Sequence, residues 1–198
     1  MKMNRSKGVM TGKAHLAWLV ALIVFIAVGC GGRKNVATND PSSPLYRASG
    51  IDFHKYDTAI IDLNDVSTNN GQGDDEVKAT SQQSLETWLK QSGIFKSVRN
   101  NGETVEGKAI VIKAKVSVNW GSRAARALVG MGAGRATIAI TYNVVDKDTN
   151  KLVAKMDVSD AMTGMSGQAW GGDAKQLVYQ GTEKWNKVFI NNVLQGQQ

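Results

Sequence analysis

The stretch "KAIVIKAKVSVNW", residues 108–120, carries the most regular pattern in the chain and decides its fold class. From Ile110 to Trp120 every second side chain is apolar, and Lys113 and Lys115 stand among the side chains in between. A period of two sustained over this length is typical of a β-strand with one face in the core and the other in water. We therefore predict a long strand here, with the two lysines on its wet face.

Two further strands are predicted in "ATIAITYNVVDKDTNKLVAKMDVSDAM", residues 136–162, joined by a tight turn at residues 146–150. Asn150 tolerates the left-handed backbone conformation that such a turn requires. Upstream, residues 58–66 are typical of a mostly buried strand and residues 95–99 of a short edge strand. Two sets of hairpin side chains are expected to share the core face: Ile138, Ile140, Tyr142 and Val144, and Leu152, Ala154, Met156 and Val158.

Two amphipathic helices complete the pattern. The first begins at Asp74 and Asp75, whose charges suit the positive end of a helix dipole, and ends at Gly93; the second begins near Asp173. Their expected core residues are Val77, Ser81, Ser84, Leu85, Trp88 and Leu89, and Ala174, Leu177, Val178, Gly181, Trp185, Val188 and Phe189. The order of elements predicts an α+β fold. We expect a single domain, with a mixed, mostly antiparallel sheet of about five strands and two helices packed on one face.

Residues 1–29 are typical of an export signal. Residues 1–13 contain four basic residues and no acid, and an apolar run from Ala14 to Gly29 follows, interrupted only by His15. That run has 16 positions, whereas a membrane-spanning helix needs about 20. Cys30, the single cysteine of the chain, stands directly after it.

Ala27, Val28 and Gly29 before Cys30 resemble the lipobox of bacterial lipoprotein precursors. The resemblance implies that Cys30 receives acyl chains, palmitate among them, and becomes the N-terminus after cleavage. Two or more such chains anchor a protein stably in a membrane. By the same resemblance, Gly31 implies sorting to the outer membrane with a periplasm-facing body. A buried structural cysteine and an uncleaved N-terminal anchor are the alternatives.

We therefore divide the chain into a signal peptide (residues 1–29), a lipidated cysteine with a flexible tether (30–50) and a periplasmic α+β domain (51–198). The tether contains both prolines of the chain and few apolar residues, which is typical of an extended or disordered segment. Without residues 1–29 the chain has 20 basic and 17 acidic residues, a net charge of +3. We expect no nucleic-acid partner, because such binding needs a clustered basic face.

The residues offer little for catalysis or cofactor binding. In "GMGAGR", residues 130–135, the glycines lead into a strand, unlike those of a nucleotide-binding loop, so a tight loop or a small-residue packing contact fits better. Asp52, His54 and Asp57 offer metal-ligating atoms, but three ligands within six residues seldom converge. A surface histidine is the better interpretation. We predict that the protein is not an enzyme and has no metal, no cofactor and no small-molecule substrate.

Two glycine-rich loops contain the candidate partner-binding residues. Met162, Met165 and Trp170 lie in "MTGMSGQAWGG", residues 162–172, just before the last helix. Loops often carry contacts, and exposed Trp and Met are enriched at interfaces. Trp120 stands at the start of the other loop, and we expect it on the same edge of the domain. Alternatively, Trp170 folds back onto the final helix as a hydrophobic staple.

The segment "GMGAGRATIAITYNVVDKDTNKLVAK", followed by a glycine-rich loop and an amphipathic helix, resembles the bacterial lipoprotein family DUF4410, a domain of unknown function. The resemblance covers residues 57–193. Its specific positions are Gly132, Gly134, Asp146, Asp148 and Thr149, and Asn150 stands where the family commonly has Gly. The order of elements is also similar to that of the TolB N-terminal domain and of curli-secretion lipoproteins, which is a fold analogy and transfers no function.

These patterns predict a non-catalytic, outer-membrane-anchored lipoprotein that acts as a protein-interaction or assembly module in the bacterial cell envelope. Its partners would be the membrane, through the acyl chains, and an unidentified envelope protein or a second copy of the chain. The alternative is an oligomeric component of a secretion or pore assembly whose glycine-rich loop, residues 121–134, contacts the bilayer. Lys113 and Lys115 on the preceding strand count against insertion of that strand.

Overall fold

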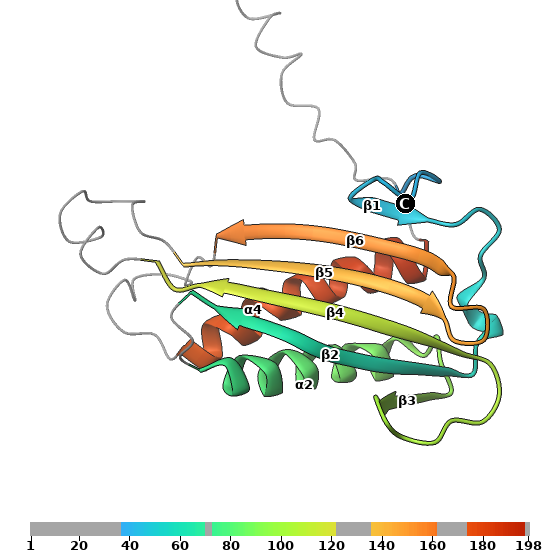
Figure 1. The fold of residues 1–198 in the computed structure, drawn as a ribbon, viewed down its shortest axis with the longest axis horizontal. Coiled ribbons are helices and arrows are strands. Elements are labelled where there is room, and N and C mark those ends of the chain that lie inside the picture. Colours follow the sequence, from blue (N-terminus) through green and yellow to red (C-terminus); the bar gives the residue numbers. More distant parts are fainter. Residues whose placement is uncertain (1–36, 70–72, 122–135, 162–173, 197–198) are drawn as a thin grey trace, which may run out of the picture. The chain divides into compact units, whose positions relative to one another are not determined.

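The computed structural model describes residues 37–69, 73–121, 136–161 and 174–196. Their strands form a six-stranded sheet in the order β1-β6-β5-β4-β2-β3, and Figure 1 shows the two helices side by side along this sheet. The strands are β1 (Leu45–Arg47), β2 (Thr58–Thr68), β3 (Ser97–Asn100), β4 (Ala109–Asn119), β5 (Thr137–Asp146) and β6 (Leu152–Ala161). The helices are α2 (Asp74–Ser92) and α4 (Ala174–Val188), with a 3₁₀ turn η1 (Phe53–Lys55) and a π-helical turn η2 (Phe189–Leu194).

The predicted α+β fold class is confirmed. Strands β4, β5, β6 and β1 pair antiparallel, whereas β2 pairs parallel with both β4 and β3. The β2–α2–β3 unit supplies one of these two parallel pairs, because a crossover helix returns the chain to the same end of the sheet. The turn between β5 and β6 is also confirmed, with Asn150 at a φ of 53°.

The sheet has one strand more than expected, β1 (Leu45–Arg47). This strand lies within the segment 30–50 that was predicted to be a flexible tether, so that prediction is wrong for these residues. Leu45 and Arg47 pair with Met156 and Ala154 of β6, and the side chain of Tyr46 is only 5% exposed. A three-residue edge strand beside two prolines leaves almost no periodic signal in a sequence. It forms because the edge of β6 offers unpaired backbone groups.

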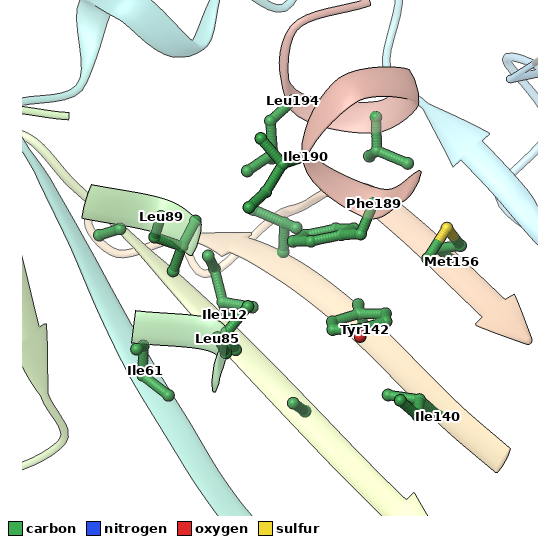
Figure 2. Close-up of a cluster of buried hydrophobic side chains, with 14 of the residues drawn as sticks. Ile61, Leu85, Leu89, Ile112, Ile140, Tyr142, Met156, Phe189, Ile190 and Leu194 are labelled. Atoms are coloured by element: carbon green, nitrogen blue, oxygen red, sulfur yellow. The ribbon is translucent and has the colours of Figure 1, made fainter. Parts of the chain in front are cut away.

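The core lies between the helices and one face of the sheet. The alternation predicted for β4 is confirmed, because every second side chain from Ile110 to Val118 is apolar and buried on this face while Lys113 and Lys115 are exposed. Figure 2 shows Ile112 of β4 and Tyr142 of β5 pointing toward the helical layer. The hydrogen bond from Gln195 N to Ile190 O spans five residues, which is typical of a π-helical turn. In this turn, η2, four apolar side chains are buried: Phe189, Ile190, Val193 and Leu194.

Three predicted core placements need correction. Leu152 pairs with Val145 beyond a bulge in β6, and Val153 is buried in its place. Trp88 and Trp185 are only partly buried at the margin of the core, and lysine ammonium groups lie over both indoles. Amphipathic lysines cover apolar surface in this way, so both Trp side chains pack against the core without being fully buried.

A buried polar network joins the two helices to the sheet. The Tyr142 hydroxyl donates a hydrogen bond to Asn186 Oδ1 (2.7 Å), and Asn186 Nδ2 donates to Ser84 Oγ (2.9 Å). The ring of Tyr142 also stacks on Phe189, with centroids 4.3 Å apart. Burial raises the pKa of the Tyr142 phenol, so it stays protonated and acts as a donor.

Candidate functional site

The sheet face opposite the helices, here called the open face, is polar at its centre. Cross-strand pairing aligns two rows of side chains across it, because directly paired residues point to the same face. One row is Asp62, Lys113, Asn143 and Lys155, and the next is Asp65, Lys115, Thr141 and Asp157. Each row therefore places carboxylates, ammonium groups and neutral hydrogen-bonding groups on neighbouring strands.

A β-bulge in β2 brings both aspartates into these rows. Asp62 pairs with Lys113 and Asp65 with Lys115, so β2 uses one residue more than β4 over this interval. Leu63 is 4% exposed and points into the core, whereas Asn64 is the extra, exposed residue. The amide of Asn64 donates a hydrogen bond to the Asp62 carboxylate. Bulges redirect side chains and are enriched near functional sites, so this irregularity marks the open face as a candidate site.

The bulge borders a shallow hollow of about 280 Å³, here called the bulge groove. Its lining residues come from β2, β4 and β5: Asp62, Asn64, Asp65, Lys113, Ala114, Lys115, Thr141 and Asn143. Carboxylate and amide oxygens accept hydrogen bonds, while the lysines and the amide nitrogens donate them. The groove therefore suits a partner surface that carries both donors and acceptors.

The charges of the open face are partly neutralised within it. Lys115 Nζ lies 2.8 Å from Asp65 Oδ2, and Lys155 Nζ lies 2.6 Å from Asp157 Oδ2. The exposed Lys115–Asp65 pair contributes only about 0–1 kcal/mol to stability, whereas the Lys155–Asp157 pair is half-buried. Among the described residues, no carboxylate lies within 4.0 Å of the Lys113 ammonium. Lys113 is therefore the cation of the groove that is most available to an acidic group on a partner.

The candidate partner residues from the loops fall largely outside the described residues. Cys30, Met162, Met165 and Trp170 lie there, as do residues 122–134 of the loop considered for bilayer contact. Trp120 is described. Its indole is partly buried against the core and does not line the bulge groove, and its backbone N–H donates to Asn69 Oδ1 (3.1 Å).

The three residues considered as metal ligands are used in other ways. Asp52 Oδ1 accepts the backbone N–H of His54, whose side chain is exposed. Asp57 Oδ1 lies 2.6 Å from Lys96 Nζ, and this partner lowers the pKa of the aspartate. No group of three or more His, Cys, Asp or Glu side chains suited to a metal occurs in the described part of the chain.

The motif at residues 146–150 is a structural turn. Asp146 Oδ1 accepts hydrogen bonds from the backbone N–H groups of Asp148 and Thr149 and from the Thr149 hydroxyl. Asp146 Oδ2 accepts from the Tyr56 hydroxyl (2.8 Å). Burial, together with this bond to Asp146, raises the pKa of Tyr56 to about 12, so the phenol remains a donor. The turn thus ties the hairpin to the chain segment before β2.

The sequence prediction placed Lys113 and Lys115 correctly on a wet face but missed the rest of the bulge groove. The missing residues are Asp62, Asn64, Asp65, Thr141 and Asn143. A weak signal was available, since "DLND" at residues 62–65 breaks the alternation expected of a strand. Such a break predicts a bulge only when the pairing of the neighbouring strand is known.

The chain belongs to the DUF4410 family, whose model, described as "Domain of unknown function (DUF4410)", matches residues 34–165. The predicted family is therefore confirmed. No curated protein matches the chain. Within the described ranges, no helix is long and apolar enough to cross a membrane.

Two solved structures show a distant similarity to this chain. A PelC dodecamer from Paraburkholderia phytofirmans is 12% identical, with 70% of this chain and 96% of that chain covered and a TM-score of 0.40. A DUF330 protein from Xanthomonas campestris is 12% identical, with 72% and 86% covered and a TM-score of 0.42.

Proposed function

We propose that this protein is a non-catalytic lipoprotein, anchored in the outer membrane through Cys30 and facing the periplasm, whose domain binds another envelope protein. The anchoring part rests on the basic, apolar and small-residue pattern of residues 1–30. The binding part rests on one observation, the bulge groove in the open face. The protein acts as an interaction or assembly module.

The composition of the open face supports docking of a protein surface. An antiparallel sheet often leaves one face in water, so an uncovered face alone indicates no function. Here, however, a bulge interrupts the ladder beside a mixed set of charges, and Lys113 has no described carboxylate partner within 4.0 Å. Complementary charges at an interface set specificity and association rate. The geometry supports recognition of a polar surface with an acidic group opposite Lys113.

The test compares two variants of the groove with a matched control. Lys113→Glu reverses the available charge, and Thr141→Arg fills the groove, while Lys151→Glu makes the same charge reversal at an exposed residue outside the groove. Tagged, acylated protein is captured from detergent-solubilised envelopes, and co-purifying proteins are quantified. We expect both groove variants to lose at least tenfold of a co-purifying protein that wild type and Lys151→Glu retain. Lys113→Glu and Lys151→Glu should keep the thermal midpoint of wild type within about 2 °C, because exposed substitutions rarely change stability by more than 0.5 kcal/mol. The midpoint of Thr141→Arg, at a half-buried residue, is measured beside them.

Equal recovery of every co-purifying protein with wild type and with both groove variants would contradict docking on the open face. The anchor is tested separately. Cys30→Ser should leave an unprocessed, unacylated precursor, whereas the wild type should float with membranes and need detergent for extraction. Recovery of wild type in the soluble periplasmic fraction would contradict the anchor but leave the groove result unaffected.

A further inference from the structure

The N-terminal arm, residues 37–47, is fastened to the edge of the sheet by backbone hydrogen bonds. Thr38 N donates to Leu45 O and Arg47 N donates to Thr38 O, both at 2.9 Å, so Thr38 pairs with β1 on its outer side. Asp157 N of β6 donates to Pro44 O (2.7 Å), which extends the ladder between β1 and β6 by one bond. The arm is therefore part of the folded domain from Thr38 onward.

Side chains hold the arm as well. Tyr46 is 5% exposed. Arg47 Nη2 donates to Ile51 O (3.2 Å), and its guanidinium lies 5.4 Å from the centre of the Phe53 ring. Between Thr38 and β1 the chain reverses at Asp40, whose Oδ1 accepts the backbone N–H of Ser42 (2.9 Å). Asp followed by Pro is a preferred start for such a turn.

The arm fixes the length of chain left between the domain and Cys30. Seven residues, 31–37, separate Cys30 from Thr38. Fully extended, the steps from Cys30 to Thr38 span at most about 29 Å, whereas a tether through residue 50 would span about 75 Å. As flexible chains, the two would average about 15 Å and about 25 Å. The folded arm thus shortens the maximum reach more than twofold.

We propose that this arm holds the domain at the membrane surface, so that the partner of the bulge groove is a protein exposed at the surface of the same membrane. This inference rests on the proposed function, because it takes Cys30 as the anchor. The strand order puts the groove strands β5, β4 and β2 two to four strand spacings from β1, or about 10–19 Å. The distance across the sheet, up to about 19 Å, and the extended tether, about 29 Å, together keep the groove within about 48 Å of the bilayer.

The charge of the tether also supports contact with the membrane surface. Arg33 and Lys34 lie within residues 31–37. Basic residues next to an anchor are attracted to anionic lipid headgroups by about 1 kcal/mol each. The tether meets the domain at the β1 edge, so the open face lies beside the attachment point and remains accessible to a neighbouring membrane protein. A short tether raises the effective concentration of such a neighbour and excludes distant partners.

The arm is tested by limited trypsin digestion of the full acylated chain in vesicles of phosphatidylethanolamine and phosphatidylglycerol at 3:1. We expect cleavage after Arg33 or Lys34 and release of a domain that retains Arg47 at an internal position. Thr38→Pro removes the N–H that donates to Leu45 O and should add cleavage after Arg47, whereas Thr38→Ala should behave as wild type. Cleavage of wild type after Arg47 at the same rate as after Lys34 would overturn the inference.

The distance between the domain and the membrane is measured in the same vesicles, by energy transfer from a dye attached at Ser159→Cys to labelled lipid. A ten-residue Gly-Ser insertion between Asn35 and Val36 should raise the average tether length about 1.6-fold, against about 1.2-fold for a tether through residue 50. Transfer should therefore fall clearly on insertion. Unchanged transfer would contradict the short tether. Chains that fail to float in these vesicles would instead contradict the anchor itself.

The partner class is tested with a photo-cross-linking amino acid at Thr141 in the full chain in cells. We expect adducts with proteins that stay in the membrane fraction after a high-salt and alkaline wash. Adducts only with soluble proteins, or no adduct with a membrane protein, would overturn the assignment of the partner. Either result would leave the groove variants as the independent test of docking.

Discussion

At the scale of a residue, the hydrogen bonds of Asp146 explain its part of the turn motif without any bound ligand. Its carboxylate accepts four hydrogen bonds, from Asp148 N, Thr149 N, the Thr149 hydroxyl and the Tyr56 hydroxyl. These bonds favour the charged form, and the pKa of Asp146 is lowered from 3.8, chiefly by the Thr149 backbone. The turn motif recognised in the sequence is therefore a device for closing the hairpin.

We predict that Asp146→Ala lowers the free energy of unfolding by about 1–2 kcal/mol, because several hydrogen bonds are lost at once. Since the pKa is lower in the folded state, the stabilisation is present above the ordinary value of 3.8 and is lost as pH falls through the folded pKa. Chemical denaturation at neutral pH and at pH 3 measures the effect, which should shrink in acid. Asp148→Ala is the control. A pH-independent difference would contradict the role of the carboxylate charge.

The buried network is a second residue-scale feature, and periodicity could not reveal it. The sequence placed Tyr142 and Ser84 on core faces, but Asn186, at 2% exposure, breaks the apolar stripe of α4. Polar groups enter a core only when they find partners, and partners on other elements are invisible in a local pattern.

We predict that Tyr142→Phe lowers the free energy of unfolding by about 1–3 kcal/mol, although it removes only one oxygen atom. The ring can still stack on Phe189, but Asn186 Oδ1 loses its donor inside the core. Denaturant titration gives the measurement. Adding Asn186→Leu to Tyr142→Phe should cost less than the sum of the single changes, because the orphaned amide is gone. Full additivity would argue against a coupled network.

At the scale of elements, the long strands and both helices were predictable because their alternation and caps are local. The bulge in β2 was not, since it depends on which residues of β4 lie opposite. The same holds for β1, whose three residues form a strand only because β6 offers an open edge. Long elements with many periodic residues can thus be predicted from the sequence, whereas short or irregular elements can be assigned only when the strand they pair with is known.

Deleting Asn64 tests whether the bulge serves binding or stability. Without the extra residue, Asp62 and Asp65 would still face Lys113 and Lys115 in a regular ladder. We predict a thermal midpoint within about 4 °C of wild type, equivalent to roughly 1 kcal/mol, together with loss of groove-dependent capture. A midpoint fall of more than 10 °C with capture retained would make the bulge a structural device.

At the scale of the whole molecule, the folded domain extends beyond the family match. The DUF4410 model ends at residue 165 and does not include α4 or η2. Yet these two elements carry Val178, Phe189, Ile190, Val193 and Leu194, each at most 3% exposed, into the same core as the sheet. Without them, half of the helical layer would be missing and the apolar face of β5 and β6 would meet water.

We therefore predict that a chain spanning residues 37–165 does not unfold cooperatively, because a domain needs both layers to enclose its core.

Phe189→Ala in the chain spanning residues 37–198 should lower the free energy of unfolding by about 3–5 kcal/mol, since it removes a side chain that is 0% exposed and stacked on Tyr142. Ending the chain after residue 196 is the control and should leave the thermal midpoint unchanged. Calorimetry of the four chains, residues 37–165, 37–196 and 37–198 and the Phe189→Ala variant, provides the comparison. The prediction would be wrong if residues 37–165 unfolded cooperatively with a thermal midpoint within a few degrees of that of residues 37–198. In that case the domain would be stable without α4 and η2.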